Sequence, residues 1–149
     1  MNVMKWTSDW MMQDVVTGIV LVILNPDTKD VMERWQFEVS CDKPLLDEDS
    51  KAKSKLEQRM TVKDIQRQIG AVLKQIVASV SLLPATSLDS VCSFNILVYT
   101  KDNLDVPADW QESSAQTIPN AQQLRFRQVH TSVHSVESSV TYRAVDSSL

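Results

Sequence analysis

One long amphipathic helix, predicted over residues 61–83, constrains the fold most, because most other periodic segments of the chain are predicted strands. Its apolar residues recur at steps of three and four, which gathers them on one helix face. Thr61 and Asp64 have the spacing of a capping box, and Pro84 marks the end. We expect the apolar face to lie against a core, and it comprises Val62, Ile65, Ile69, Val72, Leu73, Ile76, Val80 and Leu83.

The segments on either side of this helix are typical of β-strands. Residues 15–24 are continuously apolar and β-branched, residues 31–40 alternate in part, and Asn25-Pro26-Asp27 between them predicts a hairpin. Further strands are predicted over 91–100, 124–129 and 133–145, with an irregular connection over 101–120 and a short helix over 1–13. This order predicts an α+β fold in which the long helix backs a mainly antiparallel sheet.

Composition and charge exclude several functional classes. The 149 residues suit one domain, and the formal net charge of -4 argues against binding to a phosphate backbone, so no nucleic-acid partner is expected. The longest apolar run, over 19–24, is too short to span a bilayer, and the N-terminus lacks the pattern of a signal peptide. We therefore expect a soluble intracellular protein with no membrane partner.

The sequence predicts no catalytic, cofactor or metal site. Cys41 and Cys92 belong to no CxxC pattern. His130 and His134 are four residues apart in a predicted strand, which would separate them by about 13 Å, too far to share an ion. Because unpaired strand edges bind other chains through backbone hydrogen bonds, a partner-binding module is the leading interpretation and an enzyme the weaker one.

Several segments carry a family resemblance: VMERWQFEVSCDK, DIQRQIGAVLKQIVASVSLLP, CSFNILVYT, VPADWQES and QQLRFRQVHTSVHSVESSVTYRA. Collinear from about Asp9 onward, they resemble the mitotic arrest-deficient group of spindle assembly checkpoint proteins, a HORMA-domain family. The resemblance implies a single, partial HORMA domain over residues 1–149, with a mobile β safety belt over 101–149. It also implies that the family's N-terminal strand and helix are absent, which would expose Val20, Val22 and the apolar face of the long helix.

The resemblance implies a checkpoint adaptor that traps partner peptides by strand addition and belt closure and so delays anaphase. The implied partners are a coiled-coil kinetochore receptor and the mitotic co-activator of the anaphase-promoting complex. A HORMA-like adaptor with an AAA-type remodelling ATPase would reopen the closed form. No cofactor or enzymatic activity is implied, and the expected location is the nucleus, the kinetochore and the cytoplasm.

The resemblance also assigns site residues. Those expected around the peptide are aromatic side chains and one face of the strand over 91–100, namely Trp10, Trp35, Phe94, Ile96, Val98, Trp110 and Tyr142. A possible self-dimer would use Lys74, Gln75 and Leu82, where lysine replaces a family arginine and leucine a phenylalanine. Two alternatives are a truncated, poorly folding isoform that titrates partners, and a HORMA accessory subunit of a DNA-repair or meiotic complex.

Overall fold

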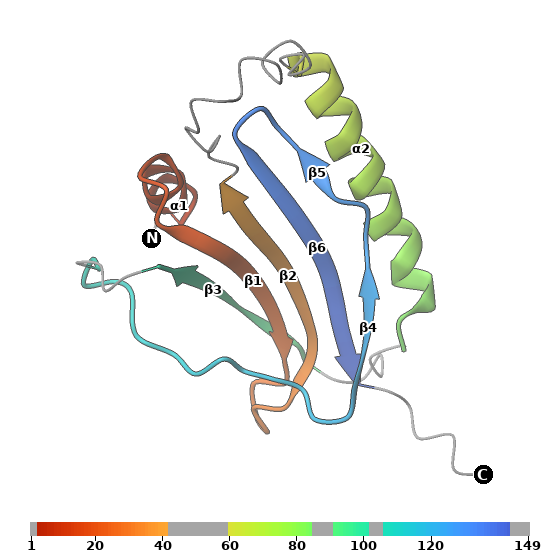
Figure 1. Ribbon diagram of the computed structural model, residues 1–149. Coiled ribbons are helices and arrows are strands. Elements are labelled where there is room, and N and C mark those ends of the chain that lie inside the picture. Colours follow the sequence, from red (N-terminus) through yellow and green to blue (C-terminus); the bar gives the residue numbers. More distant parts are fainter. Residues whose placement is uncertain (1–2, 42–59, 85–90, 102–105, 144–149) are drawn as a thin grey trace.

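The computed structural model describes residues 3–41, 60–84, 91–101 and 106–143 (Figure 1). The predicted belt therefore lies partly outside the described residues, at 102–105 and 144–149. The elements are α1 (Val3–Met12), β1 (Val16–Leu24), β2 (Val31–Cys41), α2 (Val62–Ser79) with a 3-10 turn (Val80–Leu82), β3 (Ser93–Thr100), β4 (Ala121–Arg125), β5 (Val129–His130) and β6 (His134–Arg143). No helix among these is both long and apolar enough to cross a membrane.

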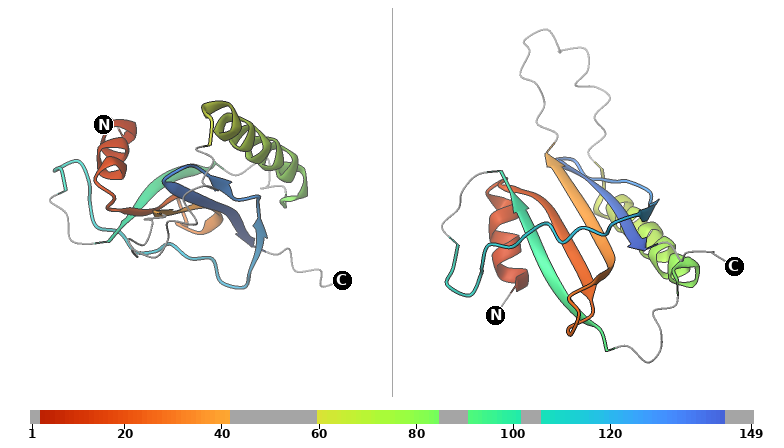
Figure 2. Two further views of the ribbon diagram at one scale, coloured as in Figure 1. Left: turned by 45° about the horizontal axis from the view of Figure 1, so that its top comes forward. Right: turned by 90° about the horizontal axis from the view of Figure 1, so that it is seen from below.

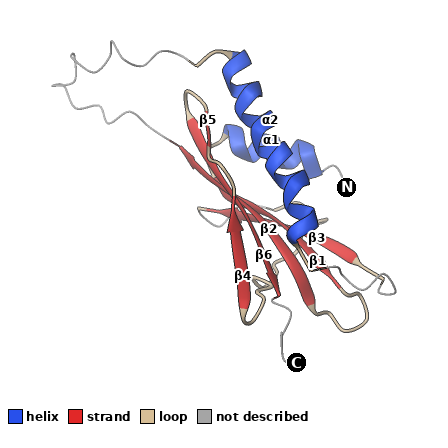
Figure 3. Ribbon diagram, turned by 90° about the vertical axis from the view of Figure 1, so that its right-hand side faces the viewer, coloured by secondary structure: helices blue, strands red, loops and turns tan. Residues whose placement is uncertain are grey.

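The strands form one antiparallel sheet in the order β3-β1-β2-β6-β4, with β5 also paired to β6. Both helices lie on one face of this sheet (Figure 3). The segment 106–120, which we call the strap, crosses the other face on its way to β4 (Figure 2). The predicted α+β class, the β1–β2 hairpin and the strands predicted over 91–100 and 133–145, which correspond to β3 and β6, are confirmed. The single strand predicted over 124–129 was wrong, because the structure has two strands there, β4 and β5, with residues 126–128 outside both.

The N-terminus of α2 has the predicted capping box. Thr61 Oγ1 accepts a hydrogen bond from the Asp64 amide at 3.2 Å, and Asp64 Oδ2 accepts one from the Thr61 amide at 3.3 Å. Hydrogen bonds from the Thr61 side chain and backbone lower the pKa of Asp64 below its ordinary value of 3.8, and Arg67 nearby lowers it further. The helix is thus stabilised at the end where its first amides lack intrahelical partners.

The apolar face of α2 is only partly buried, so the prediction of a continuous core-facing stripe was wrong, whereas the expectation that this face would be exposed is confirmed in part. Val72 is buried, whereas Ile69, Leu73 and Val80 are 45%, 56% and 59% exposed. The physical reason is position: α2 packs against β5 at one margin of the sheet and does not lie across its centre (Figure 1). Helix periodicity reports which face is apolar, but not how much of that face finds a partner.

Fully buried residues lie on both faces of the sheet: Val20 and Val22 on the strap side, and Val140, which pairs with Trp35, on the helix side. Val20, Val22 and Leu24 form one core cluster, with Val31 and Leu97 packed against them. Asn95, which pairs with Val22, donates a hydrogen bond to Gln116 of the strap at 3.3 Å, so the strap covers this face. The expectation that Val20 and Val22 would be exposed was therefore wrong, because both are 0% exposed.

Candidate functional site

The sheet has two edges, and α2 lines the β5 part of one of them. The side-chain amide of Gln68 accepts a hydrogen bond from the His130 amide at 2.8 Å and donates one to the His130 carbonyl at 3.2 Å. Gln75 accepts a hydrogen bond from the Arg127 amide at 2.8 Å. These glutamines satisfy backbone groups of the outermost segment that an open edge would leave unpaired.

The other edge is β3. This strand pairs with β1 on one side, and no strand in the described part of the chain pairs with its other side. An edge strand presents a row of backbone donors and acceptors that an extended segment of another chain can use. β3 is therefore a ready position for one more strand.

The strap wraps around this edge. It runs from beside α1 and returns under β3, β1 and β2 (Figure 2). At one end, the Trp110 ring meets the Trp10 ring edge-on, with centroids 5.2 Å apart, and Trp6 extends the cluster at 6.2 Å from Trp10. Further along, Gln116 contacts Asn95 of β3, and Ile118 is buried. The strap is thus fastened to α1 through Trp110 and to β3 through Gln116.

A cavity of about 510 Å³ lies between β3 and the strap. Its walls combine apolar side chains of β3 and α1 with polar side chains of the strap, and the lining residues are Trp10, Ile96–Thr100, Val106 and Trp110–Ala115. The indole Nε1 of Trp110 is buried and has no hydrogen-bond partner among the described residues. A buried donor without a partner costs about 1–3 kcal/mol, so an acceptor supplied by a ligand would stabilise this site.

The structure brings four of the seven predicted peptide-site residues together: Trp10, Ile96, Val98 and Trp110 line the cavity. Three others lie elsewhere. Phe94 is 65% exposed near the start of β3. Trp35 on β2 is buried and stacks on Phe126 with centroids 6.0 Å apart, while Tyr142 on β6 donates a hydrogen bond to Gln122.

The sequence reasoning missed the strap residues of the cavity wall, from Gln111 to Ala115, and also Val106. The segment VPADWQES carried the family resemblance, but these residues show no periodicity and no reactive group, so the sequence did not indicate that they line a cavity. Of the residues predicted for self-association, Lys74 and Leu82 are exposed, and Gln75 is engaged within the chain through Arg127.

Comparison with known proteins gives a consistent result. The HORMA domain profile matches residues 3–140. The mitotic spindle assembly checkpoint proteins MAD2A of Dictyostelium discoideum and Homo sapiens are 41% and 40% identical to this chain over 142 residues. Each alignment covers 95% of this chain, which spans 66% and 65% of those relatives, just under two thirds of their length.

A solved structure shares the fold. In the crystal structure of the mitotic checkpoint complex, one chain superposes on this protein with a TM-score of 0.76 at 30% identity. The match covers 96% of this chain and 71% of that chain.

Proposed function

The chain belongs to the HORMA domain family, and we propose that it is a spindle assembly checkpoint adaptor that holds a partner's extended peptide between β3 and the strap. Its similarity to the MAD2A proteins, and to a chain of the mitotic checkpoint complex, supports the checkpoint branch of the family. It also disfavours a role in DNA repair or at the meiotic axis.

The observation that carries this proposal is that the outer edge of β3 pairs with no other described strand and that the strap runs around this edge. A peptide added there would gain affinity from main-chain hydrogen bonds, and its alternate side chains would gain selectivity from the two faces of the strand. Ile96 and Val98 offer an apolar surface on one face, and Leu97 and Tyr99 line the other. A carbonyl group of the peptide or one of its side chains would satisfy Trp110 Nε1.

The position of the segment 121–143, which we call the tail, supports the same function. Strand β6 pairs with β2 from Glu33 to Cys41, on the side of the sheet away from β3. Because the tail pairs with β2, the outer edge of β3 stays available for a partner's strand. The strap, which joins β3 to the tail, passes over this site. Release of a peptide would then require local opening of the strap or the tail, which slows dissociation.

We propose the partners that the family resemblance implies. The peptide segments come from a coiled-coil kinetochore receptor and from the mitotic co-activator of the anaphase-promoting complex. The adaptor acts by binding and not by catalysis, in the nucleus, at the kinetochore and in the cytoplasm. A HORMA-like adaptor with an AAA-type ATPase would reopen it, and exposed Lys74 and Leu82 are available for self-association.

Backbone-methylated peptides test strand addition directly. Two versions of one fluorescent co-activator peptide are made, with N-methyl groups at odd positions in one and at even positions in the other. Because an added strand points alternate amides toward β3, one version should lose binding and the other retain it. Fluorescence anisotropy measures both, with a scrambled peptide as control, and equal affinity of the two versions would contradict the proposal.

A further inference from the structure

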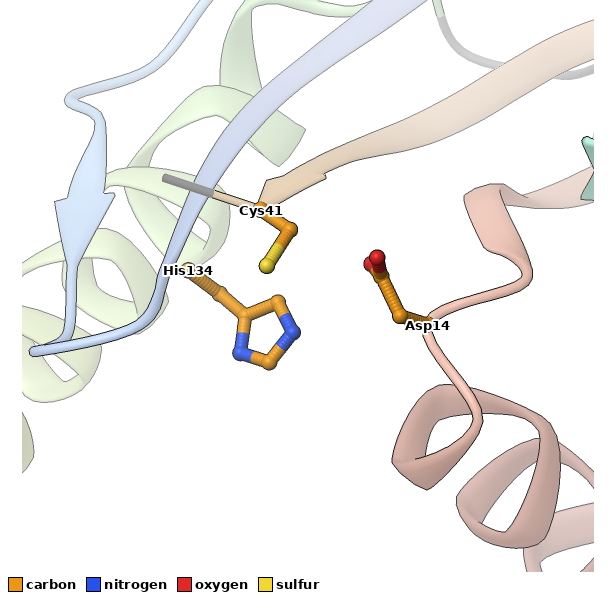
Figure 4. Close-up of side chains that lie close together, drawn as sticks. All are labelled: Asp14, Cys41 and His134. Carbon is orange, nitrogen blue, oxygen red and sulfur yellow. The ribbon is translucent and has the colours of Figure 1, made fainter. Parts of the chain in front are cut away.

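Three potential metal ligands from distant parts of the chain meet at one end of the sheet. Asp14 lies in the turn after α1, Cys41 ends β2 and His134 begins β6 (Figure 4). One ligand atom of each lies within 4.8 Å of those of the other two, and all three residues are half-buried. We propose that Asp14, Cys41 and His134 bind a transition-metal dication of the Zn²⁺ type.

The backbone itself places two of these ligands side by side. Cys41 and His134 are direct partners in the antiparallel β2–β6 ladder, so both side chains project from the same face of the sheet. Asp14 reaches the same point from α1, where its backbone has a φ of 57°. An aspartate tolerates this left-handed conformation, which turns the chain from α1 into β1.

The donor set selects the class of metal. A thiolate, an imidazole and a carboxylate suit Zn²⁺ and chemically similar ions, whereas Mg²⁺ and Ca²⁺ require mostly oxygen ligands. Tetrahedral Zn²⁺ with its usual bond lengths holds ligand atoms about 3.3–3.8 Å apart. Small rotations of the three side chains would bring atoms within 4.8 Å of one another to that separation. Three protein ligands leave a fourth position for water or for an exogenous ligand.

Among the residues that the structure describes, Lys101 is a cation next to the site that a bound metal must accommodate. Its Nζ lies 3.1 Å from Asp14 Oδ2, and its side chain is 46% exposed. Each oxygen of a carboxylate can accept more than one partner, so metal binding by Asp14 is compatible with its contact to Lys101. The lysine can also turn toward solvent, because it is near the surface.

The site would connect the tail to the rest of the molecule. Asp14 and Cys41 belong to the N-terminal segments, whereas His134 belongs to the tail. A bound ion would therefore stabilise the arrangement in which β6 pairs with β2, because only that arrangement brings His134 to the other two ligands. The regulatory meaning of this link rests on the proposed function, whereas the metal site does not.

Cobalt(II) provides the test, because Co²⁺ replaces Zn²⁺ and a cobalt–thiolate bond absorbs in the near ultraviolet. The full chain is titrated with Co²⁺, and we expect a thiolate-to-cobalt band that equimolar Zn²⁺ abolishes. The chain offers matched controls: Cys41→Ser should lose the band and Cys92→Ser keep it. His134→Ala should weaken cobalt binding at least tenfold, and His130→Ala should leave it unchanged.

A second measurement uses the unaltered chain. Zn²⁺ should slow alkylation of Cys41 by iodoacetamide, as followed by mass spectrometry, and leave Cys92 as reactive as before. A cobalt band that survives Cys41→Ser, or equal alkylation of Cys41 with and without Zn²⁺, would overturn the site.

Hydrogen exchange separates the site from its link to the tail. Zn²⁺ should increase amide protection in β6 of the parent and not of His134→Ala, and a cobalt band without that protection would overturn the link. Peptide binding in metal-free buffer tests the proposed function independently.

Discussion

At the scale of single residues, the buried donor of Trp110 gives a direct test of the cavity. Trp110→Phe keeps an aromatic ring against Trp10 but removes Nε1, which has no partner in the described part of the chain. We expect peptide affinity to fall roughly two- to tenfold, since a net hydrogen bond contributes about 0.5–1.5 kcal/mol. Thermal stability of the free protein should not decrease.

Fluorescence anisotropy and thermal melting measure these two effects. Trp6→Phe is the matched control, because Trp6 lies at the outer end of the same aromatic cluster and does not line the cavity. Unchanged affinity in Trp110→Phe would show that the peptide does not use the indole donor.

The capping carboxylate of Asp64 predicts a pH dependence. Its pKa is lowered in the folded state, so its contribution to stability is complete above the ordinary value of 3.8 and is lost as the pH falls through the lowered pKa. We therefore expect Asp64→Ala to melt at a lower temperature than the parent at pH 7, and the difference to shrink below pH 4. Lys63→Ala, an exposed change in the same turn, is the control, and a difference independent of pH would contradict this account.

Some residue-scale features could be predicted from the sequence and others could not. Trp10, Ile96, Val98 and Trp110 were expected near a peptide, and they line one cavity. The meeting of Cys41 with His134 was not predicted, because it depends on the pairing of β2 with β6 across more than ninety residues. Periodicity and spacing along the chain report local structure and carry no register for such distant partners.

At the scale of elements, the two hydrogen bonds of Gln68 lead to a prediction of how much α2 stabilises its contact with the tail. Gln68→Ala removes both hydrogen bonds to the His130 backbone and should destabilise the β5 contact by about 1 kcal/mol, since His130 is exposed and water replaces the lost partner. Hydrogen exchange of the His130 amide measures the effect. Gln66→Ala, at an exposed position of the same helix, should leave that amide unchanged, and equal exchange in both variants would contradict the predicted role.

Two neighbouring residues of α2 test its partial burial. Val72 is 7% exposed and Leu73 is 56% exposed. Val72→Glu should destabilise the protein by roughly 3 kcal/mol or more, because it buries an unpaired charge, whereas Leu73→Glu should change stability by about 0.5 kcal/mol or less. Urea denaturation measures both variants. Similar losses would show that Leu73 is packed in solution.

The elements show where sequence patterns stop being informative. The order of helices and strands, the capping box and the β1–β2 hairpin were predictable, because each depends on local periodicity or on turn chemistry. The marginal position of α2 and the path of the strap were not. The position of α2 depends on tertiary packing that its own periodicity does not report, and the strap over 106–120 contains neither helix nor strand and so has no periodic signal.

At the scale of the whole molecule, a disulfide between β2 and β6 tests whether the tail must open. Ser40 and Ser135 are cross-strand partners with Oγ atoms 2.6 Å apart, a separation suited to a disulfide after replacement by cysteine. Cys41→Ser and Cys92→Ser prevent wrong pairing. Oxidation before peptide addition should slow association, and oxidation afterwards should slow dissociation, as measured by stopped-flow anisotropy.

Reductant provides the control, because it should restore both rates in the same sample. Variants that carry only Ser40→Cys or only Ser135→Cys, in the same background without Cys41 and Cys92, should bind peptide as the parent does. Rates that are indifferent to oxidation would show that a peptide enters and leaves without separating β6 from β2.

The path of the strap has a consequence for the whole complex. The strap leaves the sheet at one edge, beyond β3, and rejoins it at the other edge, in β4. A peptide held at β3 would therefore be encircled by protein. A short peptide could leave by sliding out along its own axis, but folded domains on both sides of the segment would block that route. A segment flanked by folded domains would therefore stay captive for much longer than the same segment as a free peptide. The lifetime of the complex would then depend on parts of the partner that never touch this protein.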